Sequence, residues 1–280
     1  MADSLVTTGA PTTTFDGRPA LSPASEILRD IARGGFAGII VGFLVAGIGG
    51  RLVMRMATIL HEGTVGIFTE KGFVIGEIDL RESTAFLFFS GVGIGLVVGT
   101  IWVIVNPWLP GRGLGRASVT AIAAIALGTP ALVQRTNSDF EVFGHDPMVV
   151  VLLIGLVGLV GFSIAVVDGA LDARLPHPLG WIRPSTTVYL IVTLIGLSLV
   201  LPLVVAFLLD RPEFRAPIRA GWALAAVGAC TLSWWVLRVM GRSAPPKALR
   251  MAGRVSLLIA VVLGVATSLP HVLSAAGMPL

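Results

Sequence analysis

Cysteine is almost absent from this chain: Cys230 is the only one among 280 residues. An internal disulfide and a metal site built from several thiolates are therefore excluded. Charged residues make up only 13% of the chain, about half of their usual share in a soluble domain. The sequence also lacks a GxSxG motif, a P-loop and a dinucleotide fingerprint. We therefore expect a chain that is not an enzyme and that carries no cofactor.

Long apolar runs dominate what is present. Hydrophobic residues form 55% of the chain, and the mean hydropathy is +0.90. A helix of about 20 apolar residues crosses the roughly 30 Å hydrocarbon core of a bilayer. The pattern predicts an all-α, polytopic transmembrane helical bundle of about seven spans, at residues 34–59, 84–106, 117–133, 147–167, 186–208, 219–238 and 253–274.

Two regions depart from this pattern. Residues 1–25 are rich in Thr, Ser, Pro and Ala and have no helical apolar period, so we expect a disordered tail before an integral membrane domain at 26–280. The third span is the weakest of the seven. It is short, and the sequence Gly128-Thr129-Pro130 interrupts it, which favours a broken helix.

The distribution of Lys and Arg sets the orientation. Twelve of them fall on the side of the N-terminal tail and six on the opposite side, with Arg51 and Arg55 left inside the first span. The positive-inside rule then places the N-terminus in the cytoplasm and the C-terminus outside. The net charge of +4 comes mostly from these short connectors, so it indicates membrane orientation and argues against nucleic-acid binding.

Small residues recur at helical spacing in three spans. The first carries Gly38, Gly42, Ala46 and Gly50, the second carries Gly91, Gly95 and Gly99, and the fourth carries Gly155, Gly158 and Gly161. Such faces let helix backbones approach closely in lipid. They predict packing between neighbouring helices of one chain, or alternatively a face for a protein partner or a second copy of the chain.

The first outer connector predicts a small β-hairpin on the outer face. Residues 65–69 and 73–80 read as two short strands around Glu70-Lys71-Gly72. The hairpin is either a structural cap or a lid over a site.

Four residues of the outer connectors and span ends are weak candidates for metal binding: His61, Glu62, His145 and Asp146. Imidazole together with carboxylate can hold a divalent ion. No fixed ligand spacing such as HExxH is present, so histidines bonded to backbone groups are the more common explanation.

Arg51 and Arg55 place two permanent cations four residues apart near the outer end of the first span. A charge inside the bilayer needs a compensating partner or a path to the headgroups. We hypothesise that they face the bundle, pair with Asp139 and Glu141, and share this site with an anionic ligand or headgroup. The alternative is that both snorkel to lipid phosphate.

Acidic residues are missing from the central part of every predicted span. Proton-coupled transporters usually place a carboxylate there, so the pattern argues against this class. Asp168 and Asp172, at the cytoplasmic end of the fourth span, are expected to pair with local arginines.

The segments GRLVMR, TEKGFVIGE and NSDF resemble those of uncharacterised multi-pass membrane proteins of high-GC bacteria, over roughly residues 30–170. The resemblance implies a bacterial cell (inner) membrane and no particular activity.

The sequence thus predicts a non-enzymatic multi-pass membrane protein, either an accessory subunit or a binder of membrane lipid or an anionic ligand. The alternative is a small transporter with a site between the first three spans. A lipid-modifying enzyme that uses the outer carboxylates is the third hypothesis.

Overall fold

The computed structural model describes residues 23–60, 66, 84, 86–133, 146–176, 184–208 and 218–277. The elements within these ranges are all helical, and they include no strand. Six of the helices are long and apolar enough to cross a membrane. The predicted all-α class is confirmed, and the helices suit a membrane protein by length and composition.

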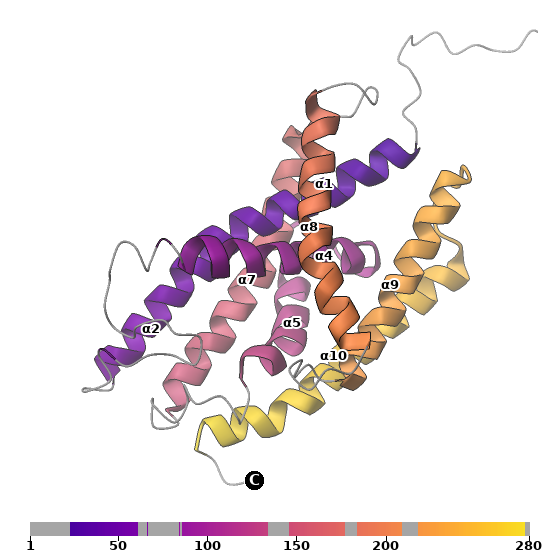
Figure 1. Ribbon diagram of the computed structural model, residues 1–280. Helices are drawn as coiled ribbons and strands as arrows, with labels where there is room; N and C mark the ends of the chain where they lie inside the picture. Colours follow the sequence, from indigo (N-terminus) through magenta and orange to yellow (C-terminus); the bar gives the residue numbers. More distant parts are fainter. Residues whose placement is uncertain are drawn as a thin grey trace, which may run out of the picture.

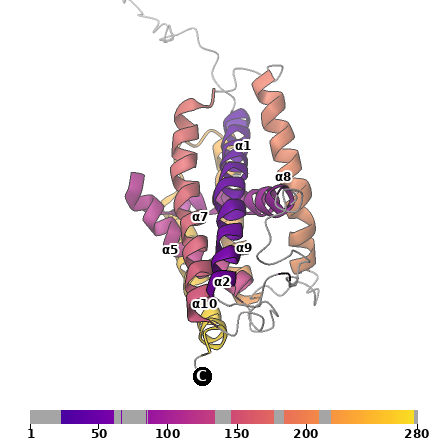
Figure 2. The ribbon, with the colours of Figure 1, turned by 90° about the vertical axis from the view of Figure 1, so that its left-hand side faces the viewer.

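The first rod of the bundle consists of α1 (Pro23–Val41), the π-helix η1 (Gly42–Gly47) and α2 (Ile48–Leu60). The second consists of the π-helix η2 (Phe86–Val92), α4 (Gly93–Val105) and the 3₁₀ turn η3 (Asn106–Trp108). These are followed by α5 (Gly113–Leu132), α7 (Pro147–Arg174), α8 (Pro184–Leu208), α9 (Ile218–Val239) and α10 (Lys247–Ala275). Figure 2 shows α7 and α8 on the two sides of α1, and Figure 1 shows α9 beside α10.

The first helix differs most from its predicted bounds. It runs from Pro23 to Leu60, 38 residues, and not from residue 34 to 59. At 1.5 Å per residue it is about 57 Å long, well beyond a hydrocarbon core of about 30 Å. The added N-terminal turns carry charged residues, which hydropathy excluded from the span but which, as described below, pair with other helices.

The seven predicted spans are not all reproduced. The six helices that meet the criteria of length and hydropathy do not include α5, which carries Arg116 in its second turn. This helix continues through Pro130 to Leu132, so the break that we expected at Gly128-Thr129-Pro130 is absent. The predicted hairpin lies outside the described residues, except for Gly66, and so does most of the predicted tail.

The glycine faces of the first two rods pack against each other. Gly34 lies against Gly99, Gly38 against Gly95, and Gly42 against both Gly91 and Gly95. A Cβ added at Gly42 would lie 2.5 Å from the Cα of Gly95, and one added at Gly99 would lie 2.5 Å from the carbonyl oxygen of Gly34. Larger residues do not fit there, so these two small-residue faces are occupied within the chain.

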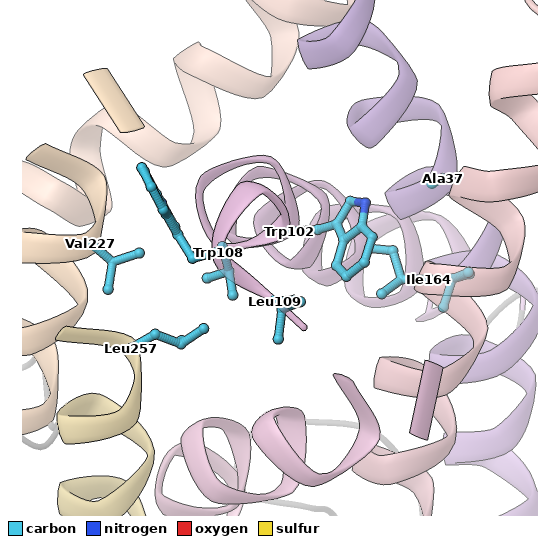
Figure 3. Close-up of a cluster of buried hydrophobic side chains, with 9 residues drawn as sticks. Ala37, Trp102, Trp108, Leu109, Ile164, Val227 and Leu257 are labelled. Carbon is cyan, nitrogen blue, oxygen red and sulfur yellow. The ribbon is translucent and has the colours of Figure 1, made fainter. Parts of the chain in front are cut away.

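The buried apolar core joins helices that are far apart in sequence. Ala37 of α1, Trp102 of α4, Ile164 of α7 and Leu257 of α10 belong to one cluster, which Figure 3 shows around Trp108. The Trp108 side chain is fully buried, and its indole N–H donates to the hydroxyl of Thr231 on α9 at 2.8 Å. This core holds the ends of α1, α4, α7 and α9 in one place, and the site is built at those ends.

Candidate functional site

A buried ion pair between α1 and α7 is the centre of the candidate site. The Arg33 Nε donates to the Asp168 carboxylate at 2.8 Å, and the Arg33 Nη1 also pairs with Asp172. The two side chains of the first pair are only 12% and 9% exposed. Asp168 and Asp172 are four residues apart, so they lie on one face of α7. They bind an arginine 135 or more positions away in sequence.

Arg29, one turn before Arg33, closes the end of α7. Its Nη1 donates to the Asp172 carboxylate at 2.9 Å. Its Nη2 donates to the backbone carbonyl of Asp172 at 2.7 Å and to that of Leu175 at 3.1 Å. The last carbonyls of a helix have no partner within it, and the helix dipole favours a cation there. Arg29 therefore satisfies the C-terminus of α7 from another helix.

Arg238 attaches α9 to the same end of α1. Its two terminal nitrogens donate to Asp30 and to Glu26, each at 2.8 Å. Glu26 and Asp30 are four residues apart on one face of α1. One guanidinium thus bridges two carboxylates, which fixes both the position and the rotation of α9 against α1.

Arg116 brings α5 to this end of the bundle. Its guanidinium donates to the backbone carbonyl of Asn106 and lies 5.7 Å from the centre of the Trp102 ring. It also interacts electrostatically with Asp168. A guanidinium over an indole face is a favourable cation–π arrangement.

We call these ionisable residues the charged cluster. Its members are Glu26, Arg29, Asp30 and Arg33 of α1, Arg116 of α5, Asp168 and Asp172 of α7, and Arg238 of α9. Four positive and four negative side chains balance one another, so the cluster is formally neutral. A set of charges that balance one another costs less to bury than one with a net charge.

A cavity lies beside the charged cluster. It has a volume of about 60 Å³. Two acids, Asp30 and Asp168, and two arginines, Arg33 and Arg238, line it. We call it the tryptophan-lined cavity because three indoles complete its wall: those of Trp102, Trp234 and Trp235.

Two polar atoms at the tryptophan-lined cavity are buried without a hydrogen-bond partner of good geometry among the described residues. They are the Asn106 Oδ1, an acceptor, and the Trp102 Nε1, a donor. The Trp102 N–H is directed at the Asp168 carboxylate, which leaves the Asn106 Oδ1 as the atom without a partner. A buried polar group without a partner costs about 1–3 kcal/mol, so an occupant that donates a hydrogen bond to this oxygen is favoured.

The residues predicted from the sequence fall elsewhere. Arg51 is half-buried on α2, and its guanidinium carbon lies 4.7 Å from the centre of the Phe86 ring. Arg55, one turn further on, is exposed. Their predicted partners, Asp139 and Glu141, lie outside the described residues. The pairing therefore stays a prediction.

The metal candidates are largely untested. Asp146 caps the N-terminus of α7, where its carboxylate accepts from the Met148 backbone N–H at 2.7 Å. His61, Glu62 and His145 lie outside the described residues. Within the described ranges, no group of three His, Cys, Asp or Glu side chains is placed to hold a metal ion.

Sequence analysis found two of the eight members of the charged cluster, Asp168 and Asp172. Their pairing with arginines is confirmed, but the partners are not local ones: they are Arg29 and Arg33 of α1, which the sequence assigned to the N-terminal tail side. A signal was present: Glu26 with Asp30, Arg29 with Arg33, and Asp168 with Asp172 are each spaced by four residues. The predicted topology also puts all six at the same end of the bundle.

Comparison with known proteins gives no relative that would assign this site. No protein-family model matches the chain, and neither a curated protein nor a solved structure matches it significantly.

Proposed function

We propose that this chain is a non-enzymatic multi-pass membrane protein that binds a membrane lipid or a small ion in the tryptophan-lined cavity. The observation that carries the proposal is the cavity wall, which combines paired charges, indoles and a buried acceptor, the Asn106 Oδ1, that lacks a partner among the described residues. Indoles prefer the headgroup level of a bilayer. A site with this lining, at the end of apolar helices, fits a group from the membrane interface.

The bacterial cell membrane, with the N-terminus in the cytoplasm, is part of the proposal. It is supported by the resemblance to membrane proteins of high-GC bacteria and by the twofold excess of basic residues on the N-terminal side. Reporter fusions at Ala244 and at Pro279 test the orientation, because α10 separates them. We expect a cytoplasmic signal at Ala244 and an outer signal at Pro279. Signals from the same side would remove α10 as a span.

A small transporter is the second candidate, and one observation favours it. The π-helices η1 and η2 pack on each other where the first two rods meet. There the rings of Phe43 and Phe88 lie edge to face, with their centres 5.9 Å apart. π-Helical turns within helices are rare and often mark functional sites. Flux of labelled ions or small solutes through proteoliposomes, compared with empty vesicles, tests this function.

Native mass spectrometry of the full chain, released from mild detergent, tests the leading proposal. We expect a mass increment equal to one lipid or one small ion on the monomer, and its loss in a Trp234→Ala, Trp235→Ala double variant. A stoichiometric protein partner with no bound lipid or ion would favour the accessory role instead. A bare chain with no increment would contradict the binding proposal.

A further inference from the structure

The charge balance of the tryptophan-lined cavity narrows the chemistry of its ligand. A simple anion placed there would gain from Arg33 and Arg238, but it would be repelled by Asp30 and Asp168. A simple cation would be attracted by the two acids and repelled by the two arginines. A zwitterionic ligand can place its negative group near the arginines and its positive group near the acids.

The arginines have donors left for a further oxygen. Arg33 makes its ion pairs through Nε and Nη1, and a guanidinium carries five N–H groups. Among the contacts of the described residues, this leaves its Nη2 for an additional acceptor. Arg238 uses one bond from each terminal nitrogen. A phosphate oxygen suits such donors because it accepts several charge-assisted hydrogen bonds.

The rest of the wall suits an ammonium group. The Asn106 Oδ1 is a buried acceptor that lacks a partner among the described residues, and an ammonium supplies three N–H donors. Indole faces attract cations, and Trp234 and Trp235 line the cavity from α9, one turn before Arg238. A primary amine can both donate to an amide oxygen and lie against an indole face, whereas a quaternary amine can do only the second.

The size of the cavity agrees with this chemistry. About 60 Å³ inside the cavity is open to water-sized groups, and the cavity is partly open to the surface. That space admits a small polar headgroup such as an ammonioethyl group.

We infer that the tryptophan-lined cavity binds a zwitterionic amine phosphate, the chemistry of phosphoethanolamine. The inference rests on the proposed binding function and names its ligand class. Two sources share the chemistry: the headgroup of an ethanolamine phospholipid and the free phosphoethanolamine molecule. The half-buried indoles of Trp234 and Trp235 on an apolar helix favour the lipid.

The test uses the purified full chain in detergent and follows its thermal unfolding with four probes: dioctanoyl phosphatidylethanolamine, phosphatidylcholine and phosphatidylglycerol, and free phosphoethanolamine. A ligand that binds only the folded state raises Tm with concentration. We expect the ethanolamine lipid to bind at least tenfold more tightly than the other two lipids. Equal or tighter binding by the free compound would overturn the lipid source.

Variants locate the site. Trp235→Ala and Asn106→Ala are expected to weaken binding of the ethanolamine lipid at least tenfold. The matched control is Trp222→Ala, because Trp222 lies near the other end of the same helix and is 55% exposed; it should leave the affinity within twofold. Equal losses in Trp235→Ala and Trp222→Ala would overturn the assignment to this cavity.

The outcomes separate this inference from the function on which it rests. Preferential binding of phosphatidylglycerol, weakened by Trp235→Ala, would overturn the amine requirement and retain a lipid-binding cavity. Binding of none of the four probes, together with no retained lipid or ion in native mass spectrometry, would overturn both.

Discussion

The two ends of the first helical rod carry the same motif and use it differently. Arg29 and Arg33 lie four residues apart near its beginning, and Arg51 and Arg55 lie four residues apart near its end. The first two are mostly buried and bind carboxylates and carbonyls of α7. Of the second two, Arg51 contacts Phe86 and Arg55 is exposed.

The hydropathy of the residues around an arginine does not show how firmly its side chain is bound. Arg51 and Arg55 sit in an apolar run and so draw attention, whereas Arg29 and Arg33 sit in a polar stretch that reads as a connector. Their partners decide the difference. Helix α7 ends beside Arg29 and Arg33 and offers Asp168, Asp172 and its own unsatisfied carbonyls. Arg29 and Arg33, which lie in the less hydrophobic stretch of sequence, are therefore held by more contacts than Arg51 and Arg55.

Loss of Arg33 should have the largest effect. Arg33→Ala leaves Asp168, only 6% exposed, without its ion-pair partner, and breaking a buried pair costs about 3–5 kcal/mol. Denaturant titration in mixed micelles measures the free energy of unfolding. Arg55→Ala is the control at the other end of the rod. A loss for Arg33→Ala no larger than for Arg55→Ala would remove the contrast between the two ends.

A change at Gly95, which packs against the middle of the first rod, should cause the second-largest loss of stability. Gly95→Ala places a Cβ against the backbone of Gly38 and 2.8 Å from the Cα of Gly42, so we expect a loss of about 1–3 kcal/mol from overpacking. Gly93→Ala is the matched control on the same helix, because nothing lies within 4 Å of a Cβ there. Equal stability of the two variants would show that the backbones of the first two rods are far enough apart to accept a methyl group at Gly95.

Loss of the ion pairs that Arg238 of α9 makes with α1 should lower stability less, because these side chains are more exposed. Arg238→Ala removes two hydrogen-bonded ion pairs whose side chains are 25–38% exposed, so we expect a loss of about 1 kcal/mol. High salt should reduce this loss, unlike that of Arg33→Ala. Unfolding at two ionic strengths separates them, and a salt response as large for Arg33→Ala would argue against its burial.

The smallest loss of stability is expected for Arg55→Ala, at the C-terminal end of the first rod. An exposed arginine that pairs with an outer carboxylate contributes about 0.2–1 kcal/mol, so Arg55→Ala should cost no more than this. The double variant with Asp139→Ala tests the predicted pairing, because coupled residues give a loss smaller than the sum of the single losses. Simple additivity would leave Arg55 as an interfacial anchor.

Much of the fold could be predicted from residue patterns alone. An apolar run of the right length favours a helix, because a helix satisfies its own backbone hydrogen bonds where no water is present. Gly91, Gly95 and Gly99 also indicated a close helix contact. The start of the first helix could not be predicted, because Glu26, Asp30 and Arg33 belong to a helix only by virtue of partners on α7 and α9.

The candidate site was predicted less well. Spacing by four shows which charges share a helix face, but not which face meets which helix. That depends on the rotation of each helix, which is fixed by side chains remote in sequence, such as Trp108 and Thr231. The cavity wall also needs four helices to meet, α1, α4, α7 and α9. No pattern within one segment reveals such a site.

A double-mutant cycle on Arg33→Leu and Asp168→Leu tests the central claim most directly, namely that a buried ion pair joins α1 to α7 and builds one wall of the cavity. The quantity measured is the free energy of unfolding of four proteins in mixed micelles. We predict that the double variant is at least about 2 kcal/mol more stable than the sum of the single losses implies, because neither charge is then left buried alone. Additive losses would contradict the pair and the cavity built on it.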